Sequence, residues 1–350
     1  MIAIKSKPMK IINFISGTDL GGPKQIFVLY SEIMANLGHD VHPVIRQGAK
    51  FKPMLESLKL PIHEVSYSRI TQQFAKTIVI KKLQAVIESI QPDVIITHKS
   101  SDLEILRKAA GENIRIIGFV YWISNKHIEH ADELVAISTV IKQFLLDNKY
   151  TKPIHLIPGM VRIDSPPRYR DLPATPLIGA MGVLRRKKGF HTLIEALAIL
   201  KKTGTPFKAI IAGKGQMRPY LLHLRRKHGL MEELIIRGWV SNDEREKFID
   251  SIDLYILPSR IETFGLVVIE AMARMKRVIA TKCGGPNEII HHGKDGFLVE
   301  KQNPKAMADQ IKQLIDKPSL SSTIPNSAME TVNANYTKEA LRNKFKELLK

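Results

Sequence analysis

The sequence contains a single cysteine and lacks any apolar stretch long enough to cross a membrane. Because Cys283 has no partner within the chain, an internal disulfide is excluded, which fits a reducing compartment. A transmembrane helix would need an apolar run of roughly 18 residues, and none occurs. The first ten residues, MIAIKSKPMK, carry positive charge without the apolar core of a secretory signal. These absences favour a cytoplasmic protein.

Aromatic residues make up only 6% of the chain, whereas lysine and arginine outnumber the acidic residues 53 to 34. The resulting net charge of +19 is spread over both halves of the sequence. Few aromatics accompany the basic runs, and neither zinc-finger spacing nor an RNP-like motif occurs, so nucleic acid is disfavoured as a partner. An anionic membrane surface or an acidic acceptor explains the charge better. A charge that serves only solubility is the alternative.

The length allows two domains, each with its own core. Apolar runs of strand length alternate with helical patterns, which predicts parallel, doubly wound α/β sheets. One of these patterns, over residues 71–90, reads as a long helix with a basic face. Residues 155–176 are rich in proline and charge and read as a linker. We therefore expect one domain over residues 1–165, a second over 174–335, and a C-terminal helix over 336–350 that crosses back to the first domain.

Residues 258–296 combine the end of a strand, a polar turn and the start of a helix. The apolar run before Pro258 reads as a buried strand, and residues 264–275 show the apolar spacing of a helix. Glu262 and Thr263 therefore lie where unpaired N–H groups and the helix dipole attract phosphate. Glu270, inside the helix, is costly to bury unless it is paired. Two solvated glutamates, or a capping Glu262 with a salt-bridged Glu270, are the structural alternatives.

This stretch resembles the group 1, or family 4, retaining glycosyltransferases, whose segment reads like PS-x-x-E-T-F-G-x-x-x-x-E-A-M-A. The matching residues are Pro258, Ser259, Glu262, Thr263, Phe264, Gly265, Glu270, Ala271, Met272 and Ala273. The resemblance implies a GT-B fold, with two Rossmann-like domains facing an interdomain cleft. The N-terminal domain would lie on the acceptor side, and the C-terminal domain would bind a nucleoside diphosphate sugar. Met275 and Arg277 replace the usual glycine and proline, from which we expect a structural adjustment only.

The resemblance also implies roles for single residues. Glu262 would contact hydroxyls of the transferred sugar, and Glu270 would contact the ribose. The departing diphosphate would be bound by the backbone N–H groups of Thr263, Phe264, Gly265 and Leu266. Near the nucleotide the resemblance places Gly213, Gly215 and the backbone of Val240, while Trp239 either lines the base or packs in the core. Since no D-x-D motif occurs, we expect neither a metal ion nor a cofactor.

Four consecutive cations, Arg185, Arg186, Lys187 and Lys188, stand between a predicted strand and a predicted helix. This position favours an anion site, and a solvated charge run is the alternative. The family segment reads like G-R-L-x-x-x-K-G, with the arginine and lysine holding the diphosphate. Lys188 matches the lysine and is a catalytic candidate. Val183 replaces the arginine, so we expect Arg185 or Arg186 to compensate.

The predicted first domain carries two candidate sites. Gly21 and Gly22 form a loop between a strand and a helix, where positive φ would let the donor approach the backbone. His98 follows a strand at the edge where open α/β sheets bind ligands, and is a catalytic candidate. A histidine whose hydrogen bonds are already satisfied is the alternative.

The family's usual acceptor-side histidine is missing from residues 119–122. Tyr121 or Trp122 would take its place, or His127 would reach in as a catalytic residue. His127 and His130 alone make a poor metal site, because they lack a third ligand.

Together these features predict a retaining glycosyltransferase that moves a sugar from a nucleoside diphosphate sugar to a glycan or glycolipid. We expect a lipid-linked or lipopolysaccharide-core acceptor at the inner membrane face, with peripheral membrane contact. The alternatives are a soluble transferase making a small glycoside, and a non-catalytic module that binds sugar nucleotides or nucleic acid. The oligomeric state is left open.

Overall fold

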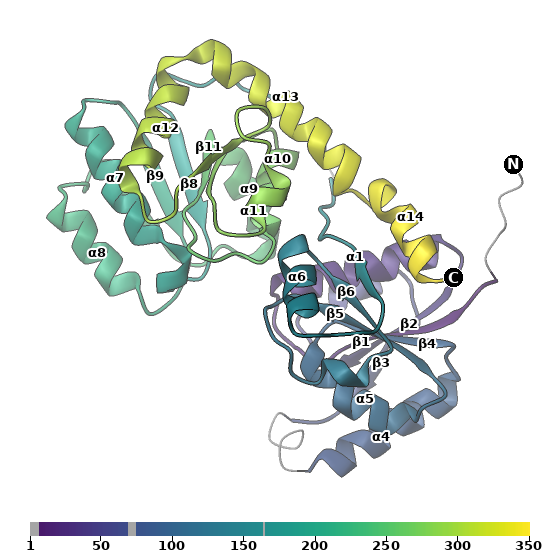
Figure 1. Cartoon of the computed structure of the whole chain (residues 1–350). Helices are drawn as coiled ribbons and strands as arrows, with labels where there is room; N and C mark the ends of the chain where they lie inside the picture. The colour runs from purple at the N-terminus through teal and green to yellow at the C-terminus, as the bar shows by residue number, and fades with distance from the viewer. Residues whose placement is uncertain (1–6, 69–74, 164) are drawn as a thin grey trace, which may run out of the picture. The chain divides into compact units, whose positions relative to one another are not determined.

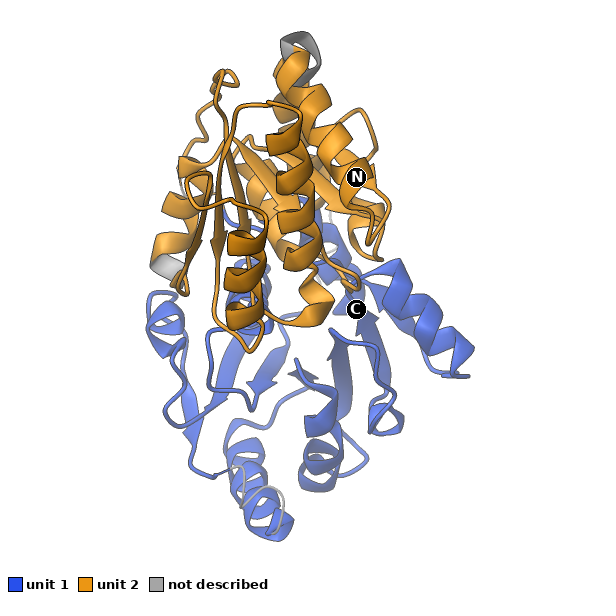
Figure 2. Ribbon diagram, turned by 90° about the vertical axis from the view of Figure 1, so that its left-hand side faces the viewer, with its two compact units in different colours: residues 1–162, 338–350 blue, residues 163–337 orange. Residues whose placement is uncertain are grey.

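The computed structural model describes residues 7–68, 75–163 and 165–350, which fall into two compact units (Figures 1 and 2). The first unit comprises residues 1–162 and 338–350, and the second comprises residues 163–337. Each unit is built on one parallel sheet, so the expectation of two doubly wound, Rossmann-like units is confirmed. Within the described ranges, no helix is both long and apolar enough to span a bilayer.

The first unit holds a seven-stranded sheet in the order β3-β2-β1-β4-β5-β6-β7. The strands are β1 (Lys10–Ile15), β2 (Asp40–Arg46), β3 (His63–Val65), β4 (Val94–Thr97), β5 (Arg115–Val120), β6 (Glu133–Ala136) and β7 (Ile154–Leu156). The central strand β1 is buried from Ile11 to Ile15, as expected for a parallel strand with both faces covered. The strand order reverses between β1 and β4, and this switch point is where such sheets bind ligands.

Helices cover both faces of this sheet. They are α1 (Gly22–Asn36), α2 (Lys52–Glu56), α4 (Lys76–Ile90), α5 (Leu103–Ala110), α6 (Thr139–Asp147) and α14 (Lys338–Leu348). On one face α4 packs against α5, and on the other α14 packs against α1 (Figure 1). The C-terminal helix α14 belongs to this unit because the Phe345 ring lies 4.8 Å from Tyr30, between ring centroids. The helix predicted over residues 71–90 begins at Lys76, and residues 71–74 lie outside the described ranges.

The second unit holds a six-stranded sheet in the order β10-β9-β8-β11-β12-β13. The strands are β8 (Leu177–Met181), β9 (Lys208–Ala212), β10 (Leu234–Arg237), β11 (Leu254–Leu257), β12 (Arg277–Thr281) and β13 (Phe297–Val299). The helices are α7 (Phe190–Lys202), α8 (Arg218–Lys227), α9 (Asn242–Ser251), α10 (Leu266–Ala273), α11 (Pro286–Ile289), α12 (Pro304–Asp316) and α13 (Pro318–Asn335). Its switch point lies between β8 and β11, which are hydrogen-bonded neighbours.

Helix α10 is shorter at both ends than the helix predicted over residues 264–275. Gly265, its N-cap residue, has φ 107°, and Met275 has φ 55°. Both conformations are left-handed and cannot continue a right-handed helix. Glycine takes such a φ without strain, whereas methionine pays roughly 1–2 kcal/mol for it. The adjustment expected at Met275 is therefore a left-handed turn between α10 and β12.

Candidate active site

Two loops meet at the switch point of the second unit. The loop after β8 leads through a short 3₁₀ turn, Arg186–Lys188, into α7, and the loop after β11 leads into α10. They touch through the backbone, because the Arg260 N–H donates to the Lys187 carbonyl at 2.8 Å. A β-carbon at Gly189 would lie 1.8 Å from the Pro258 carbonyl oxygen, so only glycine permits this approach. The fold thus brings two segments that are far apart in the sequence into one place at the carboxyl edge of the sheet; Lys188 and Glu262, for example, are 74 positions apart.

An ion pair joins the two loops. Lys188 Nζ lies 2.5 Å from Glu262 Oε2, and both side chains remain partly open to solvent. The Glu262 backbone is fixed on its other side: its N–H donates to the Cys283 carbonyl at 3.0 Å, and its carbonyl accepts from the Gly285 N–H at 2.8 Å. The sequence alternative of two solvated glutamates is therefore wrong for Glu262. Cation and carboxylate are held at the edge where an α/β sheet binds ligands.

The start of α10 lies directly beside this pair. Gly265 is the N-cap and offers no side chain to its first N–H groups. Thr263 and Phe264 are buried, and the Phe264 ring packs edge-on against Tyr336 at 5.8 Å. Backbone N–H groups from Thr263 to Leu266 thus sit next to a lysine, which is a favourable arrangement for phosphate. The Phe264 side chain itself is part of the core.

Glu270 is held by a partner that the sequence analysis did not identify. In the middle of α10, its Oε2 lies 2.7 Å from Arg245 Nε on α9. The two atoms lack the alignment of a hydrogen bond, so the contact is an ion pair. Burial raises the pKa of the Glu270 carboxyl above its ordinary value, and Arg245 opposes that shift. The alternative of a salt-bridged Glu270, stated in the sequence analysis, therefore describes this carboxylate when no ligand is bound.

Two of the three remaining cations of the β8 loop are exposed to solvent. Arg185 and Arg186 are exposed, and neither side chain is paired with an acid among the described residues. Val183, in place of the family's arginine, is also exposed, at 39%. Burial and the neighbouring Lys188 lower the pKa of Lys187. Two arginines therefore remain available for an anion within the loop that carries Lys188.

Gly213 and Gly215 have a packing role that the sequence did not reveal. A β-carbon at Gly213 would lie 2.0 Å from the Gly182 carbonyl oxygen, and one at Gly215 would lie 2.4 Å from the Leu184 carbonyl oxygen. Both glycines thus let the loop after β9 press against the loop after β8. Beyond them Val240 is buried, whereas Trp239 is 48% exposed, so core packing of Trp239 is excluded.

In the first unit, His98 is buried at the β1–β4 switch point. Its Nδ1 lies 2.6 Å from the Tyr121 hydroxyl and its Nε2 lies 2.9 Å from Asn13 Oδ1, while the ring stacks on Phe119 at 4.7 Å. Asn13 Nδ2 donates to Ser31, which leaves Oδ1 to accept from Nε2–H and assigns Nδ1 as the acceptor for Tyr121. Burial lowers the pKa of His98 to about 3, so the ring is neutral.

This geometry corrects the catalytic assignment of His98. Both ring nitrogens are occupied and the side chain is only 2% exposed, so neither nitrogen is free to reach a substrate. The alternative of a satisfied histidine describes it better. Tyr121, one of the candidates for the place of the family's usual histidine, is anchored by His98 through its hydroxyl. His98 is therefore a positioning residue for Tyr121.

His127 does not join this cluster. Its Nδ1 lies 3.5 Å from Glu104 Oε2 on α5, and its backbone is left-handed, with φ 64°. Glu129 supplies the third potential metal ligand that the sequence analysis missed, since ligand atoms of His127, Glu129 and His130 lie within 4.8 Å of one another. All three are on one short turn at the surface, so this grouping does not connect His127 to the switch point.

Gly21 and Gly22 lie at the start of α1, as its N-cap and its first residue, but without positive φ. Gly21 is the N-cap of α1 with φ −69°, which any residue adopts. A β-carbon there would lie 3.1 Å from the Asp19 carboxylate, which is paired with Lys24 at 2.6 Å. A side chain here would require the largely exposed Asp19 carboxylate to shift by a few tenths of an ångström, and the backbone conformation does not itself require glycine.

Comparisons with known proteins agree with this architecture. The family model "Glycosyl transferases group 1" matches residues 169–331. The chain is 25% identical to the lipopolysaccharide core biosynthesis glycosyltransferase LpsE of Rhizobium meliloti (strain 1021), over 97% of this chain and 99% of that protein.

Two solved structures share the fold. Anabaena Alr3699/HepE in complex with UDP and glucose superposes with a TM-score of 0.81 at 19% identity, covering 97% of this chain and 99% of that one. A glycosyltransferase from Rickettsia africae ESF-5 superposes with a TM-score of 0.83 at 22% identity, covering 98% of each chain. The chain therefore has the GT-B fold, and its residues 169–331 match the group 1 glycosyltransferase family.

Proposed function

We propose that the chain is a retaining, family 4 glycosyltransferase whose donor, a nucleoside diphosphate sugar, binds at the β8–β11 switch point. The observation that carries this proposal is the Lys188–Glu262 pair beside the start of α10. Lys188, an exposed arginine of its loop and the N–H groups of α10 together form an anion site of the kind that holds a diphosphate. The carboxylate of Glu262 provides an acceptor for sugar hydroxyls next to it.

In this proposal the ion pair opens when the donor binds. Lys188 moves from Glu262 to a phosphate oxygen, and Glu262 accepts hydrogen bonds from the sugar. The bond between the anomeric carbon and the phosphate oxygen then breaks while a bond to the acceptor oxygen forms on the same face. The acceptor proton passes to the leaving phosphate. Lys188 and the α10 N–H groups stabilise the negative charge that develops there, without a metal ion.

Glu270 is proposed to hold the ribose. Its carboxylate has one ion-pair contact with Arg245, and the oxygen in that contact makes no hydrogen bond. Two ribose hydroxyls would donate to it and offset the burial that raises its pKa.

For the donor base we propose uracil and for the acceptor a lipopolysaccharide-core or lipid-linked glycan at the inner membrane face. The choice of uracil rests on the UDP complex of the Anabaena protein. The choice of acceptor rests on the name of the full-length Rhizobium relative. The net charge of +19 favours contact with an anionic surface. The protein would then act in the cytoplasm with peripheral membrane contact.

The test is donor turnover. The purified chain is incubated with UDP-, GDP- and ADP-sugars, and release of nucleotide is followed with and without glycan acceptors. Glu262→Gln should reduce turnover by about 10²–10³-fold, whereas Glu232→Gln, an exposed glutamate in the turn before β10, should not change it. Nucleotide binding without turnover of any donor would support the non-catalytic module instead.

A further inference from the structure

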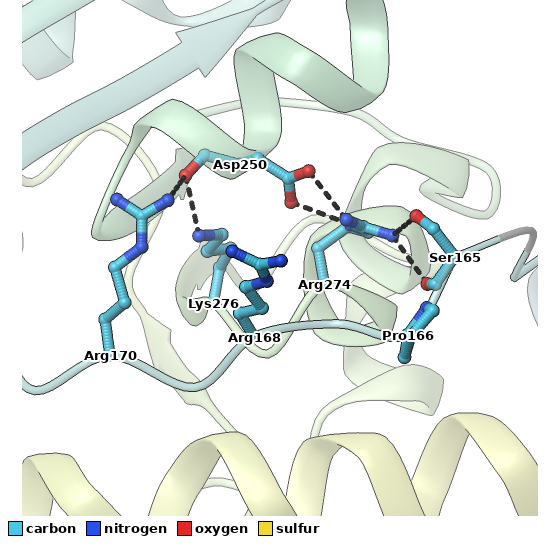
Figure 3. Close-up of a pocket in the computed structure, with 7 residues that line it drawn as sticks. All are labelled: Ser165, Pro166, Arg168, Arg170, Asp250, Arg274 and Lys276. Atoms are coloured by element: carbon cyan, nitrogen blue, oxygen red, sulfur yellow. Dashed lines mark hydrogen bonds and ion pairs between the residues drawn. The ribbon is translucent and has the colours of Figure 1, made fainter.

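A basic pocket lies at the opposite, amino edge of the second sheet, away from Lys188 and Glu262. It encloses about 330 Å³. The lining residues are Ser165, Pro166, Arg168, Arg170, Asp250, Arg274 and Lys276 (Figure 3). They come from the segment before β8, the end of α9 and the turn between α10 and β12. Four of the seven are cationic and one is acidic.

The single acid is already used within the pocket. Asp250 accepts from Arg274 at both carboxylate oxygens, at 2.8 and 2.6 Å (Figure 3). Arg274 also donates to the carbonyl and the hydroxyl of Ser165, each at 2.9 Å, which ties the segment before β8 to α10. Asp250 and Arg274 therefore form a neutral pair, and the charges of Arg168, Arg170 and Lys276 are left over.

Lys276 is the most deeply buried of these cations. It is only 4% exposed, and its Nζ donates to the Asp250 carbonyl at 3.0 Å. Arg170 donates to the same carbonyl at 3.1 Å. A buried ammonium group with three N–H donors is costly unless an anion or several acceptors surround it. Burial and the nearby Arg170 accordingly lower the pKa of Lys276 to about 8.

Arg168 completes the arrangement. Its side chain is exposed at the pocket and takes part in neither a hydrogen bond nor an ion pair within the described ranges (Figure 3). An arginine fork next to a second arginine and a buried lysine matches the geometry and charge of a phosphate group, which accepts several hydrogen bonds at once. A carboxylate has fewer oxygens to offer these three cations.

We propose that this pocket binds the phosphate group of an anionic ligand through Arg168, Arg170 and Lys276, at a site separate from the donor site. The phosphate would come either from the headgroup of an anionic phospholipid or from a soluble phosphate ester. Because Arg168 and Arg170 belong to the segment that leads into β8, binding would also fix the conformation of that segment.

The experiment removes the donor site as a competing anion site. In a Lys188→Gln background, inorganic phosphate and glycerol 3-phosphate are titrated calorimetrically at low salt. Vesicles of phosphatidylglycerol and of phosphatidylcholine are tested by co-sedimentation. Three forms are compared: the background itself, Arg168→Gln/Arg170→Gln, and the matched control Arg226→Gln/Lys227→Gln, which removes two exposed charges from α8. None of these measurements depends on glycosyl transfer, so the result stands whether or not the proposed function holds.

We expect at least tenfold weaker binding in Arg168→Gln/Arg170→Gln and unchanged binding in the control. If Arg168→Gln/Arg170→Gln loses binding of phosphate and glycerol 3-phosphate, the phosphate group in the pocket comes from a soluble ester. If this variant loses only the binding of phosphatidylglycerol vesicles, the phosphate group comes from a lipid headgroup. Lys276→Met provides a second variant that keeps the buried volume filled, and it should lose the same binding. Equal weakening in the α8 control would show general charge attraction only. That result, or absence of binding in the background protein, would overturn the proposal.

Discussion

Lys188 Nζ and Glu262 Oε2 lie 2.5 Å apart, although they come from loops after different strands. In the proposed mechanism, donor binding separates this pair: Lys188 then contacts the phosphate and Glu262 contacts the transferred sugar. The substitution Glu262→Gln distinguishes these two roles. Glu262→Gln releases Lys188 for phosphate, and UDP lacks the transferred sugar that Glu262 would contact. We therefore expect UDP to bind several-fold more tightly to Glu262→Gln while donor turnover falls by about 10²–10³-fold. Calorimetry measures the affinity for UDP, and a nucleotide-release assay measures donor turnover. If Glu262→Gln lost both UDP affinity and turnover, the two residues would not have these separate roles.

Burial raises the pKa of Glu270, and this has a defined effect on stability. Between the unfolded pKa and the higher folded pKa, the native state binds more protons than the unfolded state. Stability therefore falls as the pH rises through that window. Glu270→Gln removes the titration, so the stability of wild type relative to this variant should decline from pH 4 to pH 7. Urea denaturation of both proteins across this pH range measures the difference in their free energies of unfolding. A difference that stays constant or rises with pH would show that Arg245 affects the pKa of Glu270 more than burial does.

His98 should not titrate in the native protein at neutral pH. Its pKa is lowered to about 3 by burial, so the unfolded chain takes up a proton near pH 6.5 that the folded chain refuses. The resulting stabilisation is complete above that pH and is lost as the pH falls toward 3. Imidazole resonances followed by NMR from pH 8 to pH 4 should show a neutral His98 throughout. A His98 signal that titrates between pH 6 and 7 would restore it as an acid–base candidate.

Gly189 should be intolerant of any side chain for two reasons that can be separated. Its φ is 67°, and a β-carbon would also meet the Pro258 carbonyl at 1.8 Å. Gly204 shares the conformation, with φ 70°, but has open space around it. Gly204→Ala should therefore lower the free energy of unfolding by about 1–2 kcal/mol, the strain of the left-handed region alone.

Gly189→Ala should lower the free energy of unfolding more than Gly204→Ala does, because the β8 and β11 loops must also move apart. It should also weaken UDP binding, which Gly204→Ala should leave unchanged. Thermal denaturation and UDP calorimetry on both variants give the comparison. Equal effects of the two substitutions would mean that the loops are not packed as tightly as the Gly189–Pro258 contact requires.

The sequence identified the switch-point loops because each feature there is local. Glu262 follows an apolar strand and precedes a helical pattern, and Lys188 lies between another strand and helix. In a parallel sheet such positions share one edge, and the resemblance to the family assigned both residues to the donor. The helix boundaries of α10 were wrong by contrast, because a left-handed Met275 leaves no signal in an apolar pattern.

Contacts between separate elements could not be read from the chain. Arg245 lies on α9, a polar helix, and only the tertiary fold brings it to Glu270 on α10. His98 fitted a catalytic position until its burial and its two hydrogen bonds were visible. The amino-edge pocket combines the segment around Arg168 with the turn at Lys276, more than 100 positions later. Each case depends on tertiary contacts that no local pattern encodes.

Binding of UDP to the wild type, Lys188→Gln and Lys305→Gln tests the central claim most directly. Lys305 is a surface lysine on α12, 77% exposed, and serves as the control for loss of one charge. Loss of a charge-assisted hydrogen bond to phosphate should weaken binding by about 1.5–3 kcal/mol, or roughly ten- to a hundredfold. We predict that loss for Lys188→Gln and no change for Lys305→Gln. Equal affinity of all three proteins for UDP would contradict a donor site at the β8–β11 switch point.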